Sequence, residues 1–394
     1  MYVDYTEEQK SLRDELREYF VGLLKETGGL GAMASMEGGE VYRTLVRQMG
    51  SDGWLGVGWP KEYGGQGRGW REQLIFYDEV RRSGAPLPFV TLNTIGPAIM
   101  EHGSEEHKRE YLPRILSGDC HFAVGYSEPE AGTDLASLKT EAVLEGDEWV
   151  INGTKMFTSG GNDADYVWLA CRTDPEAPKH KGISIIIVDA DQPGYQSSLI
   201  HTVGGGATCM TYYENVRAPA GRVVGGVNNG WLLITAQLNH ERIGLSAFGG
   251  VCGMHLEQVI EWARTTEGDD GRPVIDQPYA RMALAEATVR YEAMKLMNWR
   301  MAWAMDQEAI NPADASAAKV LGTEAAVEVY RLLLDVVGVA GLIKSGSPGE
   351  ILHGALENGY RLSQINTFGG GVNEIQREIV SMAGLRMPRV PRKG

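Results

Sequence analysis

Two segments, 125-GYSEPEAGTDLAS-137 and 153-GTKMFTSGG-161, are dense in glycines and hydroxyl side chains within a strand-rich part of the chain. Backbone N–H groups and hydroxyls that gather in loops can bind a flat polar ring or a phosphate group through hydrogen bonds. The same residues are also consistent with ordinary turns and with hydroxyls that cap strands. The surrounding sequence has to decide between a binding surface and simple loops.

The chain divides into three parts by its hydrophobic periodicity. Residues 1–120 are rich in helical patterns: Thr6 begins a TEEQ capping box, and Leu12, Leu16 and Phe20 follow at helical spacing. We therefore predict an N-terminal helical domain in this first part.

The other two parts of the chain have different residue patterns. Residues 121–228 contain β-branched and aromatic runs broken by turn signals, with 145-EGDE-148 and Asn152-Gly153 as hairpin candidates. Helical patterns return over residues 229–394, where Asn311-Pro312 predicts the N-cap and first turn of a long helix. The predicted fold class is therefore α+β, with an antiparallel β domain between two helical domains.

Composition excludes several classes of function. The 394 residues are 43% hydrophobic and 23% charged, which is typical of a soluble globular protein with two or three domains. The formal net charge of −15 argues against nucleic-acid binding, since nucleic-acid binders usually present a basic surface. The N-terminal segment lacks the features of a signal peptide, and no apolar run has the length of a membrane span. These features predict a cytoplasmic protein.

Searches for common site motifs exclude further classes of function. The four cysteines are far apart and form no CxxC or Cys/His cluster, so we expect reduced thiols and no metal site. No GxGxxG, GxxxxGK[ST] or HExxH motif is present, which argues against a Rossmann nucleotide site and a zinc protease. Met294, Met297, Met301 and Met305 recur at helical spacing, and we interpret them as core packing.

Taken together, the two opening segments resemble the acyl-CoA dehydrogenase flavoprotein family, whose loop is similar to TEPGAGSD and whose next strand is similar to KMWITNG. The resemblance extends to 58-GWPKEYGGQG-67 and 148-EWVINGTKMF-157, and to the order of helices, sheet and helices. It implies an N-terminal helical domain, a middle antiparallel β-barrel and a C-terminal helical bundle. It also implies an FAD cofactor and an acyl-CoA thioester substrate.

The resemblance assigns roles to individual residues. The backbone of Tyr126 and the backbone and hydroxyl of Ser127 should bond the pyrimidine edge of the flavin. Ser159 should bond near the reactive nitrogen, and Phe157 should pack on the ring where the family usually has Trp. Thr133 would face phosphate.

The glycine segment 367-TFGGGVNEIQ-376 departs from the family pattern. Most members have YEGTSEIQ there, and their first glutamate removes the α-proton; in this sequence that position is Gly370. The reaction still needs a base within hydrogen-bond reach and a donor to the thioester oxygen. A minority of the family carries the base on the first C-terminal helix, where this chain has Glu241-Arg242. Glu241 is the candidate base, although a surface glutamate paired with a neighbour is the alternative, and Gly370 could still donate its backbone N–H.

Three further departures concern the cofactor. Glu130 replaces a common glycine in the phosphate-facing loop, and this added charge weakens the case for phosphate contacts there. Family members hold a neighbour's FAD through an Arg-bearing segment and a glutamine. The matching places are acidic here, in 264-RTTEGDDGRPVID-276 and at Asp335. Acids facing a diphosphate would repel it, so we predict that the chain serves a neighbour's cofactor poorly.

These departures, together with FGGGVNE and the closing LRMPRVPR, are similar to actinobacterial family members that degrade steroid side chains as α2β2 heterotetramers. The resemblance implies a base-bearing subunit, a second acyl-CoA dehydrogenase-like subunit, a bulky steroid-CoA substrate and electron-transfer flavoprotein as the electron acceptor. The alternatives are a non-catalytic partner subunit, a dehydrogenase for branched or long-chain acyl-CoA, and an acyl-CoA oxidase.

Overall fold

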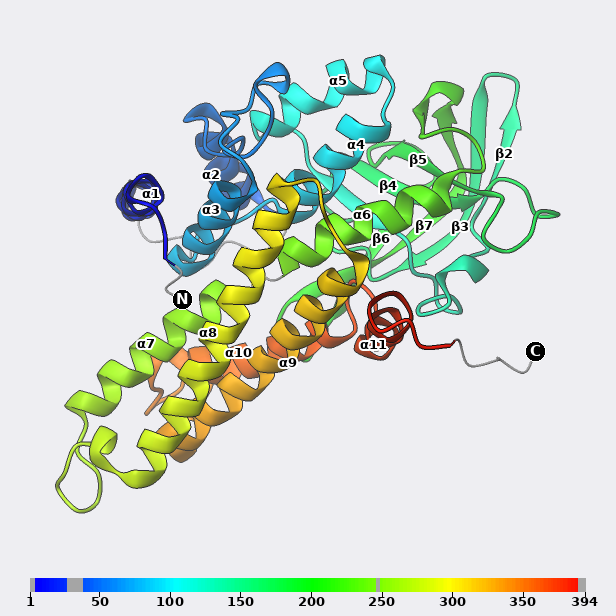
Figure 1. Cartoon of the computed structure of the whole chain (residues 1–394). Coiled ribbons are helices and arrows are strands. Elements are labelled where there is room, and N and C mark those ends of the chain that lie inside the picture. The colour runs from blue at the N-terminus through cyan, green and yellow to red at the C-terminus, as the bar shows by residue number, and fades with distance from the viewer. Residues whose placement is uncertain (1–3, 27–37, 246–248, 389–394) are drawn as a thin grey trace.

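The computed structural model of the chain describes residues 4–26, 38–245 and 249–388 (Figure 1). Within these ranges the side chains at positions 26, 238–245, 249 and 250 lie outside the described part. Helices come first, a sheet follows, and helices return, which confirms the predicted fold class. Helix gives way to strand between Leu116 and Phe122, and strand to helix between Val224 and Gly230. The domain limits at residues 120 and 228 stay a prediction.

The N-terminal helices form one layer beside the sheet (Figure 1). Their bounds are α1 Glu7–Glu26, α2 Glu40–Ser51, α3 Trp70–Ser83, η3 Val90–Ile95, α4 Gly96–His102 and α5 Glu105–Leu116. Helix α1 starts at the predicted capping box: the Thr6 N–H donates to Gln9 Oε1 at 3.0 Å, and the Gln9 N–H donates to Thr6 Oγ1 at 3.2 Å. Leu12, Leu16 and Phe20 are buried, as their spacing predicted.

The middle of the chain forms one mixed sheet. Its strands are β1 Phe122–Gly125, β2 Glu141–Glu145, β3 Glu148–Met156, β4 Tyr166–Arg172, β5 Ile183–Asp189, β6 Tyr195–His201, β7 Ala207–Pro219 and β8 Val223–Val224. The described pairs follow the order β6-β7-β3-β2-β4-β5-β8, with β1 beside β4. Most neighbours are antiparallel, whereas β1 and β2 each pair with β4 in parallel. Strand β1 is parallel because the chain reaches it from helix α5 and not through a hairpin.

One hairpin prediction is confirmed and the other is wrong. Strands β2 and β3 meet at the EGDE turn, where Gly146 has φ +69°. Asn152-Gly153 instead lies inside β3, where the register with β7 shifts between Ile151 and Gly153. A Cβ at Gly153 would lie 2.5 Å from Thr140 Oγ1. This glycine therefore allows the segment at Thr140 to approach β3 closely at a bulge.

The C-terminal helices are α6 Gly230–Leu245, α7 Gly249–Thr265, α8 Pro278–Asp306, α9 Pro312–Val337, α10 Ala355–Ser363 and α11 Asn373–Ile379. Helices α7, α8 and α9 extend as an elongated arm, whereas α6 and α11 lie beside the sheet (Figure 1). The Asn311 side chain accepts from the Ala313 N–H at 2.9 Å, which confirms the predicted N-cap of α9. Met294, Met301 and Met305 are buried in the core, and Met297 is partly buried against it.

Helix α10 returns to the sheet and determines where the following glycine segment lies. Asn358 Nδ2 donates to the Gly204 carbonyl at 3.1 Å, and Arg361 donates to the Val203 carbonyl. Both carbonyls belong to the turn between β6 and β7. These contacts bring the chain after α10 close to the β domain.

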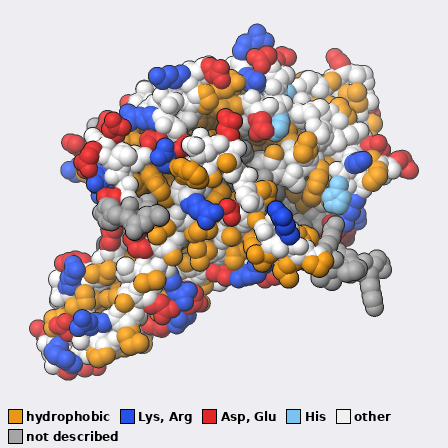
Figure 2. Space-filling model, viewed as in Figure 1, with side chains coloured by type: hydrophobic (Ala, Val, Ile, Leu, Met, Phe, Trp, Pro, Cys, Tyr) orange, Lys and Arg blue, Asp and Glu red, His pale blue; other side chains and the backbone are white. Residues whose placement is uncertain are grey.

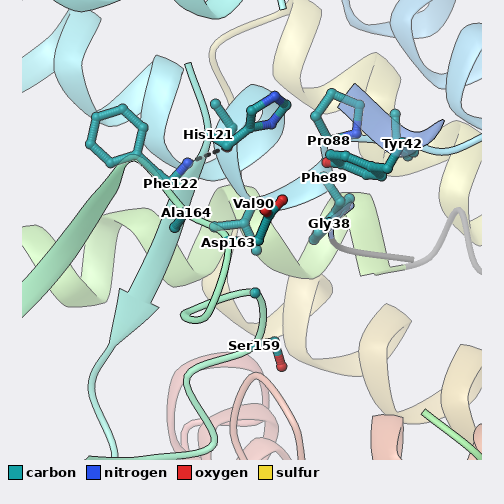
Figure 3. A pocket seen from close by; sticks show the side chains of 13 residues that line it. Gly38, Tyr42, Pro88, Phe89, Val90, His121, Phe122, Ser159, Asp163 and Ala164 are labelled. Atoms are coloured by element: carbon teal, nitrogen blue, oxygen red, sulfur yellow. Dashed lines mark hydrogen bonds between the residues drawn. The ribbon is translucent and has the colours of Figure 1, made fainter. Parts of the chain in front are cut away.

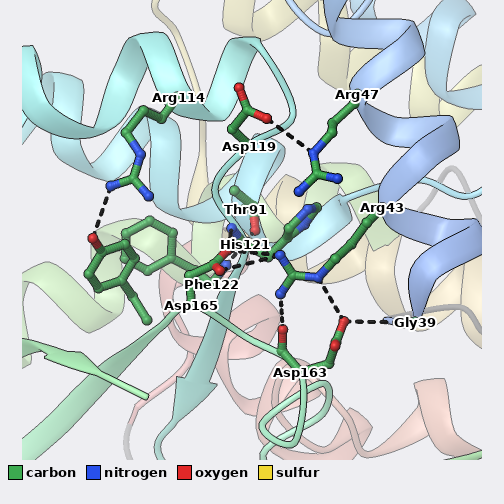
Figure 4. A network of polar contacts seen from close by, with 11 residues as sticks. Gly39, Arg43, Arg47, Thr91, Arg114, Asp119, His121, Phe122, Asp163 and Asp165 are labelled. Carbon is green, nitrogen blue, oxygen red and sulfur yellow. Dashed lines mark hydrogen bonds and ion pairs between the residues drawn. The ribbon is translucent and has the colours of Figure 1, made fainter. Parts of the chain in front are cut away.

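An arginine on α2 joins the N-terminal helices to the loop after β3 (Figure 4). Arg43 Nε lies 3.1 Å from Asp163 Oδ2, and Arg43 NH1 lies 3.3 Å from Asp165 Oδ1. Asp163 also accepts from the Gly39 N–H at 2.9 Å, and Asp165 from the His121 N–H at 2.8 Å. The Arg43 side chain is 16% exposed, so this network is largely screened from water.

We expect Arg43→Met to lower the free energy of unfolding by about 2 kcal/mol, because two half-buried carboxylates would lose their cation. Arg47→Met is the matched control. Arg47 lies one turn further along α2, and the side chains of its pair with Asp119 are 46% and 55% exposed. Its loss should cost less than about 1 kcal/mol. Urea unfolding measures both, and equal losses would contradict the prediction.

Candidate functional site

The loop after β1 is held from beneath by a buried ion pair. Lys155 Nζ on β3 lies 2.9 Å from Glu128 Oε1 and donates to the Tyr126 carbonyl at 3.1 Å. The same carboxylate accepts from the N–H groups of Lys139 at 2.7 Å and Thr140 at 2.8 Å. One buried ammonium therefore joins the loop, strand β3 and the segment that leads into β2.

Burial and charge act against each other at this pair. The Lys155 side chain is 0% exposed and that of Glu128 is 7% exposed. Burial alone would raise the pKa of Glu128, but the Lys155 charge and the hydrogen bonds outweigh it, and the net pKa is lowered. Burial lowers the pKa of the Lys155 ammonium, and the Glu128 carboxylate opposes that shift. The pair is stable as an ion pair because its oxygens are almost fully hydrogen-bonded.

A second buried network ties this loop to α6. The Tyr126 hydroxyl donates to Gln237 Oε1, and Trp168 Nε1 on β4 lies 3.1 Å from both of these oxygens. Gln237 is 2% exposed. Position 241 follows one helical turn later on the backbone of α6. The side chains of Glu241 and Arg242 lie outside the described residues.

The loops above these networks leave donors and an aromatic ring directed outward. The Ser127 carbonyl accepts from the Met156 N–H at 2.8 Å, while no described hydrogen bond uses the Ser127 N–H or hydroxyl. Phe157 is 60% exposed and has φ +62°, a conformation that bulky residues rarely adopt. Ser159 Oγ lies 3.1 Å from Thr208 Oγ1, and Thr133 is exposed. The predicted residues thus follow β1 and β3 on neighbouring loops.

A pocket adjoins Ser159 (Figure 3). Its apolar wall comes from Leu87, Phe89 and Val90, which approach from the N-terminal helices. His121 lines the same pocket and is 7% exposed. Burial lowers the pKa of His121 to about 4, so its imidazole is neutral at pH 7. Next to Ser159 the pocket therefore combines an apolar wall with the neutral imidazole of His121 and the carboxylate of Asp163.

The glycine segment has the conformation that only glycine adopts readily. Gly370 has φ +64° and Gly371 has φ +95°. The Gly369 N–H donates to the Ile365 carbonyl at 2.7 Å, whereas no hydrogen bond within the described part of the chain uses the Gly370 N–H. The role of the Gly370 N–H as a donor to the thioester stays a prediction.

The three acidic departures occupy exposed places. Glu130 pairs with Lys139 at 2.6 Å, and both side chains are 76% exposed. Asp335 pairs with Arg331 at 3.0 Å in the last turns of α9. In the segment 264–276, Asp270 pairs with Arg272 at 2.7 Å, and these side chains are 43% and 60% exposed. These contacts place the charges at the surface but do not assign them a role toward a cofactor.

The arrangement fits a flat, polar aromatic cofactor. Unused donors at Ser127 and Gly370, the hydroxyl of Ser159 and the exposed ring of Phe157 are the groups that such a ring requires at its edge and on its face. Gln237 Nε2 is also buried without a hydrogen-bond partner among the described residues.

Family comparisons cover nearly the whole chain. Models of the N-terminal, middle and C-terminal domains of acyl-CoA dehydrogenase match residues 6–119, 123–216 and 228–385, in that order. The chain belongs to the acyl-CoA dehydrogenase family. This acyl-CoA dehydrogenase thus has the three domains that the sequence predicted, and its reaction is the dehydrogenation of an acyl-CoA thioester.

Relatives are similar over their full lengths. Acyl-CoA dehydrogenase FadE26 of Mycobacterium tuberculosis is 48% identical, and FadE29 of the same organism is 47% identical, with 100% of each chain covered. A solved structure of the Tcur3481-Tcur3483 steroid ACAD is 54% identical, with a TM-score of 0.93 over 99% of this chain and 100% of that one. The ChsE4-ChsE5 complex from Mycobacterium tuberculosis is 48% identical, with a TM-score of 0.92 over 99% and 100%.

Sequence reasoning missed the residues that support the site from behind. Lys155, Glu128 and Gln237 received no role, although all three are buried. Lys155 and Gln237 are hydrogen-bonded to Tyr126, and Glu128, which belongs to the same loop, is bonded to Lys155. One signal was available, because Lys155 lies inside a strand between residues of a largely buried run, where an isolated charge would be costly without a partner. The identity of that partner requires the fold.

We expect Lys155→Met to lower the free energy of unfolding by about 3–5 kcal/mol, because it leaves the Glu128 carboxylate buried without a cation. The double variant Lys155→Met with Glu128→Gln should recover part of this loss. Lys139→Met is the control: it removes an ammonium from an exposed pair and should cost less than about 1 kcal/mol. A double-mutant cycle in urea measures the coupling, and a double variant as unstable as the sum of its single variants would contradict it.

Proposed function

We propose that this acyl-CoA dehydrogenase introduces an α,β double bond into a bulky steroid side-chain CoA thioester, with FAD as cofactor and Glu241 as the base. The observation that carries the assignment of the base is the bond between Tyr126 and Gln237. It ties the flavin-side loop to α6 one turn before position 241. Positions 237 and 241 share a helix face, since residues four apart lie one above the other.

The chemistry divides between two groups of this chain. The Glu241 carboxylate accepts the α-proton, and the backbone N–H of Gly370 donates to the thioester oxygen as negative charge develops on it. Arg242 follows the base on the same helix. FAD, when bound, accepts the hydride that leaves the β-carbon, so that a trans-enoyl thioester and reduced cofactor result. No acid stands at the glycines 369–371, and Glu241 on α6 supplies the carboxylate that the reaction needs.

The described donors supply the cofactor contacts of this proposal. The backbone at Tyr126 and Ser127 and the Ser127 hydroxyl bond the pyrimidine edge, Ser159 bonds near the reactive nitrogen, and Phe157 covers the ring. Thr133 faces phosphate. The outward donors of Ser127 and the exposure of Phe157 support these roles. Because the places near Arg264 and Asp335 are acidic, the distal half of FAD depends on another subunit.

Substrate class and electron acceptor are inferred from relatives. The 54% identical structure is described as a steroid ACAD, and a steroid side-chain thioester needs a wide site that glycines at 369–371 leave open. Electrons then pass to an electron-transfer flavoprotein.

None of the described helices combines the length and apolar character needed to cross a bilayer.

An exposed apolar stripe supports assembly with a second acyl-CoA dehydrogenase-like subunit in an α2β2 heterotetramer. Met282, Val289, Leu296 and Trp303 recur every seven residues along α8 and are 74%, 68%, 53% and 51% exposed. Figure 2 shows hydrophobic side chains on the surface of the helical arm. A seven-residue apolar repeat on one helix face is the pattern that packs against another helix. The relative ChsE4-ChsE5 is described as a complex.

Glu241→Gln should slow flavin reduction by a steroid side-chain CoA by about 10³-fold or more, because the amide cannot accept the α-proton. FAD content and substrate affinity should stay close to those of the wild type. Glu257→Gln, on the exposed pair with Arg82, is the control and should reduce flavin normally. Anaerobic stopped-flow absorbance measures the rate. Reduction at the wild-type rate in Glu241→Gln would assign the base elsewhere.

Val289→Glu with Leu296→Glu should dissociate the assembly, because two charges would be buried without partners at the contact. Thr288→Glu places one charge on the same helix beside the stripe and should leave the assembly intact. Light scattering of the chain co-expressed with its dehydrogenase-like partner measures the mass, and absorbance gives FAD per chain. An unchanged mass in the double variant would exclude α8 from the interface.

A further inference from the structure

A buried lysine lies beneath the glycine segment. Lys319 on α9 is 1% exposed, and its Nζ donates to the Gly371 carbonyl at 2.7 Å, the Thr367 carbonyl at 3.2 Å and Asn373 Oδ1 at 2.7 Å. An ammonium has three N–H donors, and three neutral acceptors converge on it. All three belong to the glycine segment or to the first residue of α11, so one side chain holds the whole turn.

The contacts of Lys319 bracket Gly370. Thr367 precedes the glycine triplet and Gly371 ends it, so their carbonyls are directed toward α9 on both sides of Gly370. Gly370 lies between them with φ +64° and with an N–H that no described hydrogen bond uses. The ammonium therefore holds the carbonyls on either side of Gly370, while no hydrogen bond among the described residues uses the Gly370 N–H.

The anchor is itself fixed by a second set of contacts. Asn373 is 2% exposed, and its Nδ2 donates to Thr323 Oγ1 at 3.1 Å and to Glu324 Oε1 at 3.0 Å. Glu324 forms a bidentate pair with Arg377, with both distances 2.7 Å. These contacts fix the orientation of the Asn373 amide, whose oxygen accepts from Lys319.

We infer that Lys319 is a positioning residue for the thioester: it fixes the glycine turn so that the Gly370 N–H is available to the substrate carbonyl. This inference rests on the proposed function. A turn containing three glycines has the largest conformational freedom to lose, so a rigid anchor matters most here. A misplacement of about 1 Å in such a donor can cost about 10²-fold in rate.

The test is a graded series, Lys319→Gln and Lys319→Met, with Thr323→Val as control. Glutamine keeps an uncharged donor, whereas methionine keeps the length of the side chain without any donor. Thr323→Val removes one of the two acceptors of the Asn373 Nδ2 group, while all three acceptors of the Lys319 ammonium remain present. Flavin reduction in single turnover should fall by about tenfold or more in Lys319→Met and by less in Lys319→Gln, with acyl-CoA affinity nearly unchanged. Thr323→Val should reduce flavin at the wild-type rate.

Hydrogen exchange supplies a readout that does not depend on turnover. In Lys319→Met, amides of residues 366–376 should exchange at least about tenfold faster, while those of β3 stay unchanged. Unchanged exchange in this segment, or an equal loss of rate in Thr323→Val, would overturn the inference. If the wild type fails to reduce flavin with any acyl-CoA, the proposed function itself fails, and faster exchange then supports only the anchoring of the turn. If Lys319→Met does not fold, Lys319→Gln decides by the same measurements.

Discussion

The ion pair between Lys155 and Glu128 supports the loop on which the cofactor side of the site depends. A loop can direct N–H groups outward only if its carbonyl groups are satisfied elsewhere, because buried unpaired carbonyls are costly. The Lys155 ammonium donates to the Tyr126 carbonyl, and the Met156 N–H of β3 donates to the Ser127 carbonyl. The carboxylate of Glu128 keeps the buried ammonium charged and extends the support to the segment before β2.

The glycine turn follows the same principle. Lys319 also holds carbonyls from beneath, those of Thr367 and Gly371, and it donates to the Asn373 side chain as well. Together the two lysines hold loops from different helices and strands in fixed conformations.

Much of the fold could be predicted from local pattern. The capping box at Thr6, the N-cap at Asn311 and the methionine repeat of α8 all describe interactions within a few residues, and the structure confirms them. Asn152-Gly153 was predicted wrongly because a dipeptide typical of turns also suits a bulge, and only the approach of Thr140 distinguishes them. Family motifs directed attention to Ser127, Phe157, Ser159 and Gly370, but not to what holds them.

The sequence by itself determined the order of helices, sheet and helices, the family, and the absence of an acid at the glycines 369–371, since these follow from residue type and spacing along the chain. Only the tertiary structure decided which buried groups meet: Lys155 with Glu128, Tyr126 with Gln237, and Lys319 with the carbonyl groups beside Gly370. These partners are separated by 27, 111 and 52 residues. No local periodicity encodes such pairs, because burial and hydrogen bonding across the fold select them.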